Sequence, residues 1–185
     1  MARTESTMLE LGTTAPDFAL TDVVTGKIVR RDDFRGQKAL LVLLICAHCP
    51  YVKHIEEALA ALGKDYAGQL VGIVAISSND ITTHPADSPA GLKLQAQTYG
   101  FVFPYLYDET QVVARSYKAA CTPDFFLFDD NLHLVYRGQF DSSRPGNGVP
   151  VTGKDLRAAI DLVLAAKPVP TDQHPSMGCN IKWKA

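Results

Sequence analysis

The stretch Ala39-Leu40-Leu41-Val42-Leu43-Leu44-Ile45-Cys46-Ala47-His48-Cys49-Pro50-Tyr51 joins an unbroken apolar run to a pair of cysteines. The apolar run is too short to span a membrane and is typical of a strand buried on both faces of a sheet. After the cysteines, apolar residues recur at helical spacing, at Val52, Ile55, Leu59, Leu62 and Tyr66. Proline is favoured at the first helical position, so Pro50 places the start of this helix beside Cys49. The stretch therefore predicts a strand-to-helix turn that carries two thiols.

The position of Cys49 indicates a reactive thiol. At a helix start, unpaired N–H groups and the positive end of the helix dipole favour the thiolate, and only the thiolate attacks peroxides or disulfides. We expect Cys49 to be the nucleophile, whereas Cys46 at the strand end should keep an ordinary pKa of roughly 8.5. His48 lies between them and is a candidate to stabilise the thiolate or pass a proton. The alternatives are a buried inert thiol at Cys49, simple packing at Cys46 and a solvated His48.

Composition restricts the class of protein. A chain of 185 residues with 46% hydrophobic residues predicts one domain, residues 1–185. The net charge of −2, with no cluster of Lys and Arg, argues against binding to nucleic acid or to an anionic membrane. Since no segment has the length of a signal peptide or of a transmembrane helix, we expect a cytoplasmic protein. Four cysteines, two of them in a Cys-x-x-Cys spacing, suit redox or metal chemistry better than a secreted disulfide scaffold.

The rest of the chain reads as alternating strands and helices. A second buried run at residues 70–76 follows the helix, which is expected to end near Gly68, and completes a right-handed βαβ unit. The other expected elements are an N-terminal β-hairpin at 19–22 and 27–30, a helix at 90–99, a strand at 101–106, a helix capped by Asp108 and running to Tyr117, a β-hairpin at 124–128 and 132–137, and a last helix through 156–164. This order predicts an α/β fold with a central mixed sheet flanked by helices.

The C-terminal tail, residues 168–185, is expected to fold back over the sheet. Ile181 and Trp183 are large apolar side chains that follow a proline-rich segment. In a disordered tail they would be exposed to water, and disordered segments are poor in such residues. Docking of the tail would bring Cys179 close to another part of the chain or to a partner.

Four motifs occur in an order that resembles a known family: His48 to Lys53, Cys121 to Asp124, Tyr136 to Gly138, and Gly178 to Trp183. They resemble peroxiredoxin-like redoxin (AhpC/TSA-like) proteins, which implies a thioredoxin-like fold with an N-terminal extension. The resemblance places Cys49 at the position of the nucleophile, and implies a cis bond before Pro123 with Cys121 near Cys49. It also shows two departures: Cys46 stands where a peroxiredoxin has a threonine that helps hold the peroxide, and Val42 stands where it has a proline.

The function expected from these features is a thiol-dependent oxidoreductase with antioxidant character and no cofactor. Cys49 would attack a peroxide or disulfide, and Cys46 or Cys121, with Cys179 as a weaker candidate, would resolve the product for a thioredoxin- or glutathione-type reductant. Arg137, at the end of a strand, is a candidate to support an anionic sulfur or peroxide oxygen; its alternative is a surface ion pair. The chain is expected to act as a monomer or homodimer.

A metal-binding module is the competing interpretation. Cys46 and Cys49 could bind zinc or copper together with Cys121, Cys179 or a histidine, because Cys-x-x-Cys suits both ions. Since the chain has only one such pair, a closed structural zinc site is less well supported than redox chemistry.

Overall fold

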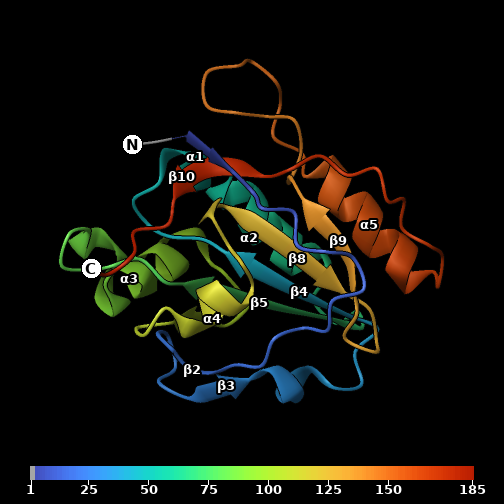
Figure 1. Cartoon of the computed structure of the whole chain (residues 1–185), viewed down its shortest axis with the longest axis horizontal. Coiled ribbons are helices and arrows are strands. Elements are labelled where there is room, and N and C mark those ends of the chain that lie inside the picture. Colours follow the sequence, from blue (N-terminus) through green and yellow to red (C-terminus); the bar gives the residue numbers. More distant parts are fainter. Residues whose placement is uncertain (1–2) are drawn as a thin grey trace.

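The computed structural model describes residues 3–185 and has a seven-stranded mixed sheet at its centre, with strand order β3-β2-β6-β5-β4-β8-β9 (Figure 1). A second sheet has three strands in the order β1-β10-β7. The strands are β1 (Arg3–Glu5), β2 (Ala19–Asp22), β3 (Ile28–Arg30), β4 (Ala39–Leu44), β5 (Val71–Ser77), β6 (Tyr105–Tyr107), β7 (Cys121–Thr122), β8 (Asp124–Phe128), β9 (Leu134–Gly138) and β10 (Met177–Asn180). The helices are α1 (Pro50–Lys53), α2 (Glu56–Asp65), α3 (Pro89–Tyr99), α4 (Val112–Ser116) and α5 (Lys154–Leu164), with 3-10 turns η1 (Arg31–Phe34) and η2 (Pro85–Asp87).

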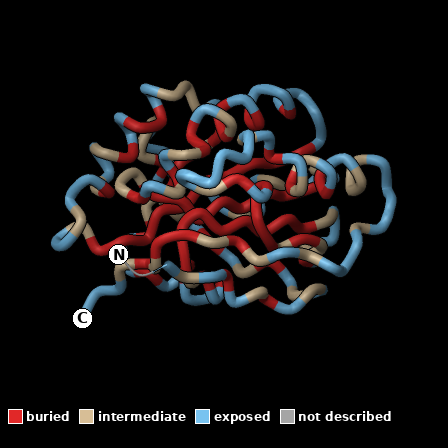
Figure 2. The backbone as a smooth tube through the Cα atoms, turned by 90° about the horizontal axis from the view of Figure 1, so that it is seen from above, coloured by how far each residue is buried: buried red, intermediate tan, exposed pale blue. Residues whose placement is uncertain are grey.

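Strand β4 is buried on both faces, as its apolar run predicts. It pairs in parallel with β5 and antiparallel with β8. Because side chains alternate along a strand, Leu41 and Leu43 pack into one core with α2, α3 and α5, while Leu40 and Val42 pack into a second core with α4 and the N-terminal segment. Figure 2 shows the buried backbone running through the middle of the molecule. The cysteines thus follow the most constrained strand of the fold.

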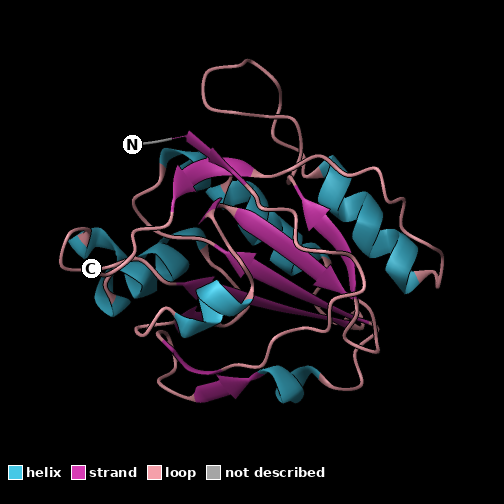
Figure 3. Cartoon of the chain, viewed as in Figure 1, coloured by secondary structure: helices cyan, strands magenta, loops and turns pink. Residues whose placement is uncertain are grey.

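The central sheet and the two hairpins are confirmed. The strands predicted at 40–45, 70–76, 124–128 and 132–137 correspond to β4, β5, β8 and β9 of one sheet. The N-terminal hairpin is β2 paired with β3, and the second hairpin is β8 paired with β9. Helices lie on both sides of the sheet in Figure 3, so the α/β architecture is the expected one.

Three local predictions are wrong. The helix after Pro50 does not continue to Gly68: it breaks at His54 and Ile55, where Ile55 leaves the helical region at φ −117° and ψ 3° and caps the second segment, α2. The strand predicted at 101–106 is reduced to β6, because Phe101 and Phe103 stack in the core at 5.0 Å and Pro104 has no N–H for a ladder.

The third wrong prediction concerns Asp108. The helix predicted through Val112 and Val113 to Tyr117 is present as α4, but its N-cap is Gln111 and not Asp108. From outside the helix, the Asp108 carboxylate accepts hydrogen bonds from Ser78 Oγ and from Ala114 N in the first turn of α4, both at 2.9 Å. It therefore ties the start of the loop after β5 to α4.

The C-terminal tail runs along the N-terminal strand. β10 pairs with β1 on one side and β7 on the other, and Figure 3 shows this small sheet beside α1. Ile181 is buried in the second core, whereas Trp183 is 37% exposed and lies under the Arg115 guanidinium at 4.3 Å. The tail thus places Cys179 over the start of α1. Within residues 3–185 no helix combines the length and the apolar character needed to cross a membrane.

Candidate active site

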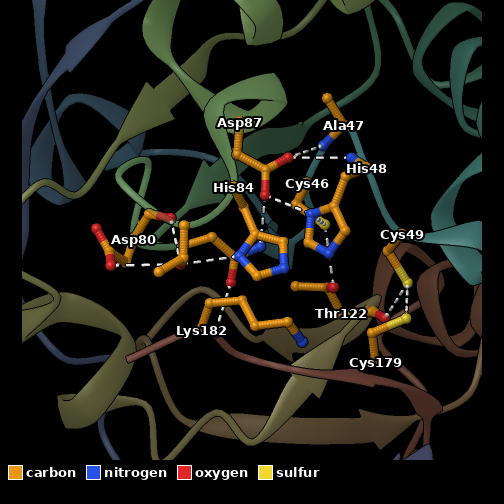
Figure 4. Close-up of polar contacts among 12 residues, drawn as sticks. Cys46, Ala47, His48, Cys49, Asp80, His84, Asp87, Thr122, Cys179 and Lys182 are labelled. Carbon is orange, nitrogen blue, oxygen red and sulfur yellow. Dashed lines mark hydrogen bonds and ion pairs between the residues drawn. The ribbon is translucent and has the colours of Figure 1, made fainter. Parts of the chain in front are cut away.

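Cys49 occupies the N-cap of α1 and Pro50 is the first helical residue, as the sequence predicts. The Cys49 side chain is fully buried. Its Sγ atom lies 2.8 Å from Cys179 Sγ and 3.2 Å from the carbonyl oxygen of Thr122 (Figure 4). All four cysteines are free, so the Cys49–Cys179 contact is one between two thiols. The sequence predicts Cys179 as the weakest of the candidate partners, whereas in the structure it is in direct contact with Cys49.

Strand pairing brings Cys179 to this place. In the ladder between β10 and β7, Cys179 lies opposite Thr122. The neighbouring Gly178 allows the close approach, since a Cβ atom at this position would lie 1.9 Å from the Thr122 carbonyl oxygen. The terminal Gly-Cys motif is the only sequence feature that points to this arrangement. The sequence does not show that the strand carrying this motif pairs with β7.

The electrostatics favour a thiolate at Cys49. A hydrogen bond from Cys46 is the main cause that lowers the pKa of Cys49 to about 5, against the opposing effect of burial. Hydrogen bonds from the Cys179 thiol and from the N–H groups of Val52 and Cys179 add to this lowering. A four-residue α1 provides only a weak helix dipole, so the expected direction of the shift is right but its main cause is local hydrogen bonding. Burial and the bond to Cys49 raise the pKa of Cys179 to about 12.

Cys46 does not have the ordinary pKa expected at a strand end. Its side chain is fully buried, with Sγ 3.2 Å from Thr122 Oγ1 and 3.7 Å from His48 Nδ1. Burial, the hydrogen bond with Cys49 and the negative charge of Asp87 raise the pKa of Cys46 well above its usual value. The expectation is wrong because Cys46 lies inside the core and not at its edge.

Asp87 was missed by the sequence analysis, although it organises the loop between the two cysteines. The carboxylate is fully buried, and one of its oxygens accepts from Ala47 N at 2.8 Å and His48 N at 3.0 Å. The other oxygen lies 2.5 Å from His48 Nδ1 and 2.8 Å from Asn79 Nδ2. Burial alone would raise the pKa of Asp87, yet the hydrogen bonds from His48 and Asn79 lower it below its ordinary value. His48 is therefore bound to a carboxylate and is mostly buried, not solvated.

The sequence feature that points to Asp87 is its position in the loop after the second buried strand. It lies in the polar loop after β5, at the carboxyl edge of the sheet, where sites form in open α/β sheets. His84, in the same loop, packs against His48, with ring centroids 4.5 Å apart and ring planes tilted by 42°.

The peptide bond between Thr122 and Pro123 is cis, as the resemblance implies. Thr122 contacts both thiols of the motif, with its hydroxyl on Cys46 and its carbonyl oxygen on Cys49. Cys121 is buried, and its Sγ atom lies 3.7 Å from the carbonyl oxygen of Pro123. Burial raises the pKa of Cys121 strongly, which makes it a poor nucleophile.

Arg137 has a structural role. Its guanidinium donates to the carbonyl oxygen of Leu9 and to Gln173 Oε1, both at 2.8 Å. These bonds tie the N-terminal segment and the C-terminal tail to β9. Among the hydrogen bonds of residues 3–185, Arg137 makes none to a cysteine, so we do not retain it as a site residue.

Three possible metal ligands, on Cys46, His48 and Asp87, lie within 4.8 Å of one another. Asp87 and His48 are directly hydrogen bonded, and Asp87 also serves two backbone N–H groups and Asn79. An ion here would have to break these bonds. The geometry is therefore that of a hydrogen-bond network and not of a prepared metal site.

Known proteins resemble this chain at three levels. A solved structure of an uncharacterized conserved protein from Geobacillus kaustophilus is 53% identical, with a TM-score of 0.97, and the match covers 100% of this chain and 97% of that one. The thioredoxin domain of a thiol-disulfide oxidoreductase from Bacteroides vulgatus is only 18% identical but has a TM-score of 0.63 over 81% of this chain and 97% of its own, which shows the thioredoxin-like fold.

The third likeness is to a curated protein. The thiol-disulfide oxidoreductase ResA of Geobacillus kaustophilus is 29% identical over 134 residues, which are 69% of this chain and 68% of ResA. The model of the AhpC/TSA family matches residues 11–137, a span that includes Cys46, Cys49, Asp87 and the cis bond. The chain therefore belongs to the AhpC/TSA family and is an oxidoreductase enzyme with a thioredoxin-like fold.

Proposed function

We propose that this protein is a dithiol oxidoreductase in which Cys49 is the nucleophile and Cys179 is its disulfide partner. The observation that carries the proposal is the 2.8 Å contact between the two sulfur atoms. The low pKa of Cys49, about 5, keeps it as a thiolate at neutral pH, while the high pKa of Cys179 keeps that thiol protonated until it reacts. Cys49 is thus the sulfur that attacks the oxidant, and Cys179 is the thiol that resolves the product as a disulfide.

With a peroxide, the Cys49 thiolate attacks one oxygen of the O–O bond, which breaks. Cys49 becomes a sulfenic acid, and the leaving alkoxide or hydroxide takes up a proton. Cys179 then attacks the Cys49 sulfur, the S–O bond breaks, and the products are water and the Cys49–Cys179 disulfide. A thioredoxin- or glutathione-type thiol supplies the two electrons that restore both thiols, and a thioredoxin-type protein reaches the buried disulfide only when β10 moves.

With a disulfide, Cys49 forms a mixed disulfide and releases one thiolate. Cys179 loses its proton to solvent and attacks Cys49, which releases the second thiol and leaves the same internal disulfide. Both routes give the same oxidised form, and they differ in the intermediate at Cys49, which is a sulfenic acid with a peroxide and a mixed disulfide with a disulfide.

The burial of the pair favours a small oxidant. Cys49 is fully buried and Cys179 is 3% exposed, so a folded protein disulfide cannot reach them unless β10 moves. Tyr51 and Met177, each two positions along the chain from Cys49 and Cys179, line a small hollow together with Pro123. We therefore propose that small peroxides and low-molecular-weight disulfides are the substrate class.

The test is oxidation of the reduced protein with hydrogen peroxide, cumene hydroperoxide or oxidised glutathione, in separate reactions, followed by peptide mass spectrometry without reduction. Wild type should form the Cys49–Cys179 disulfide. Cys49→Ser should consume no oxidant. Cys179→Ser should consume one equivalent and accumulate a Cys49 sulfenic acid that dimedone traps, or a mixed disulfide. Turnover in Cys49→Ser would overturn the assignment of the nucleophile, and a wild-type product without Cys179 would overturn that of the partner.

A further inference from the structure

Asn79 is a buried amide that takes no part in the proposed reaction. It lies two residues after β5 and is only 2% exposed. Its Nδ2 atom donates to Asp87 Oδ2, and its Oδ1 atom accepts from the N–H of Lys182, both at 2.8 Å. Because a carboxylate only accepts and a backbone N–H only donates, a single orientation of the amide satisfies both partners. One planar side chain thus joins a buried carboxylate to the C-terminal tail.

At one end, Asn79 is connected to the turn before Cys49. The Asp87 carboxylate accepts hydrogen bonds from Ala47 N at 2.8 Å and from His48 N at 3.0 Å (Figure 4). This carboxylate is fully buried, so protein groups supply its hydrogen bonds. The bond from Asn79 to Asp87 therefore helps to fix the backbone that carries Cys49.

At the other end, Asn79 is connected to the strand that carries Cys179. Lys182 follows Cys179 by three residues, and the ladder between β10 and β7 has already ended at Asn180. The carbonyl oxygen of Lys182 accepts from Asp80 N at 2.8 Å, which adds a second bond next to Asn79. The tail is thus attached to the loop after β5 directly beyond β10.

We propose that Asn79 is a positioning residue that keeps the Cys179 sulfur within reach of the Cys49 sulfur. The inference rests on the proposed function, in which Cys179 resolves the product formed at Cys49. Asn79 sets the distance between two segments from separate parts of the chain, because its amide bonds to the tail and to the Asp87 carboxylate at once. Its loss should therefore slow the resolving step and not the attack of Cys49 on the oxidant.

A second buried amide, Gln111, offers a matched comparison. It is 1% exposed, and its Nε2 atom donates to the carbonyl oxygens of Ser78 and Lys182 at 2.6 and 2.8 Å. It therefore holds the same tail residue as Asn79, from the same side of the tail's attachment to the loop after β5. Loss of Gln111 weakens the docking of the tail but leaves the bond between Asn79 and Asp87 in place.

The experiment measures the two steps of oxidation separately in Asn79→Ala, Asn79→Asp and Gln111→Ala. The initial rate of hydrogen peroxide consumption reports the attack by Cys49. With dimedone present, the ratio of Cys49–Cys179 disulfide to dimedone adduct at Cys49, measured by peptide mass spectrometry, reports the resolving step. Asn79→Asp keeps the oxygen that accepts from the tail, but it replaces the donor to Asp87 with a carboxylate oxygen. Urea unfolding shows whether each variant is folded.

Both Asn79 variants should lower the ratio of disulfide to adduct by about 10-fold, because a misplacement of about 1 Å between reacting groups can slow a reaction by up to about 100-fold. Peroxide consumption should keep the wild-type rate in both, and Gln111→Ala should keep the wild-type values of both measurements. A normal ratio in Asn79→Asp overturns the role of the bond to Asp87. An equal loss in Gln111→Ala shows that docking of the tail alone matters, and this also overturns the proposal.

Hydrogen exchange in the reduced full-length chain provides a test that needs no oxidant. Amides of the turn at residues 46–49 and of the tail at residues 177–182 should exchange faster in both Asn79 variants, whereas Gln111→Ala should affect the tail alone. Wild-type exchange at residues 46–49 in the Asn79 variants overturns the proposal even if the enzyme turns over as proposed. Conversely, a wild-type protein that forms no Cys49–Cys179 disulfide overturns the proposed function, while faster exchange in both segments still shows that Asn79 joins them.

Discussion

The sulfur atoms of Cys49 and Cys179 lie 2.8 Å apart although 130 positions separate them in the sequence. A disulfide between them would close a loop that spans 130 positions of the 185-residue chain, and it would fix β10 to the start of α1. Cross-links of long loops stabilise folded proteins by about 2 to 4 kcal/mol, mainly because they restrict the unfolded chain. We therefore expect the oxidised protein to unfold at a higher concentration of guanidinium chloride than the reduced one. Cys179→Ser should show no such difference, and equal stability of the two wild-type forms would contradict the expected disulfide.

Gly178 controls the approach of β10 to Thr122. In Gly178→Ala the added Cβ would meet the Thr122 carbonyl oxygen at 1.9 Å, so the strand must move away and carry Cys179 with it. A misplacement of about 1 Å between reacting groups costs about 100-fold in rate, so formation of the Cys49–Cys179 disulfide should slow by about 10- to 100-fold. Stopped-flow oxidation with peroxide measures this rate. In Gly148→Ala, where the new methyl group meets nothing within 4 Å, the rate should equal that of wild type. A normal rate in Gly178→Ala would show that close docking of β10 is not required.

Asp124, directly after the cis bond, makes stability depend on pH. Burial is the main cause that raises its pKa to about 7, although hydrogen bonds from Ser6 and Phe125 N oppose this. The folded protein holds the proton more tightly than the unfolded chain, so this group favours the fold at low pH and loses that contribution as the pH rises from about 4 to 7.

Asp124→Asn removes this dependence. At pH 8 the variant should exceed wild type in free energy of unfolding by up to about 3 to 4 kcal/mol, and the difference should shrink as the pH falls from 7 to 4. Urea unfolding at several pH values measures it, with Asp130→Asn on the exposed hairpin turn as the control. A difference that does not change with pH would show that Asp124 keeps an ordinary titration.

Asp87 should contribute to the free energy of unfolding. Asp87→Ala leaves the N–H groups of Ala47 and His48 without their acceptor and removes the partner of the His48 ring. Breaking a buried pair in this way costs about 3 to 5 kcal/mol, which thermal or urea unfolding would detect. Asp87→Asn keeps an oxygen acceptor and should lose less. Asp32→Ala, at an exposed ion pair, should change stability little. A variant Asp87→Ala as stable as wild type would exclude this role.

The local sequence was sufficient for the strand-to-helix turn and for placing Cys49, and not Cys46, at the helix start. The run at 39–45 is typical of a fully buried strand, and proline is favoured at the first helical position, so the sequence places Cys49 at the helix start, where the structure has it. The two hairpins can likewise be predicted from pairs of short strands joined by a turn. The parallel pairing of β4 with β5 follows from the right-handed crossover of a βαβ unit. The local pattern fails at Phe101 and Phe103. These two side chains stack in the core, and their backbone is not part of a strand as predicted.

Only the tertiary structure decided which groups surround the turn from Cys46 to Cys49. Asp87 and Cys179 come from a loop 38 residues and a strand 130 residues away in sequence, and no spacing rule connects them to Cys49. The pKa of Cys46 likewise depends on burial and on the Asp87 charge, which are properties of the folded chain. The sequence by itself determined where Cys49, the proposed nucleophile, lies in the fold, because that follows from backbone geometry over a few residues. Its partner and its charge state follow from contacts between distant segments, which form only when the core and the small β1-β10-β7 sheet assemble.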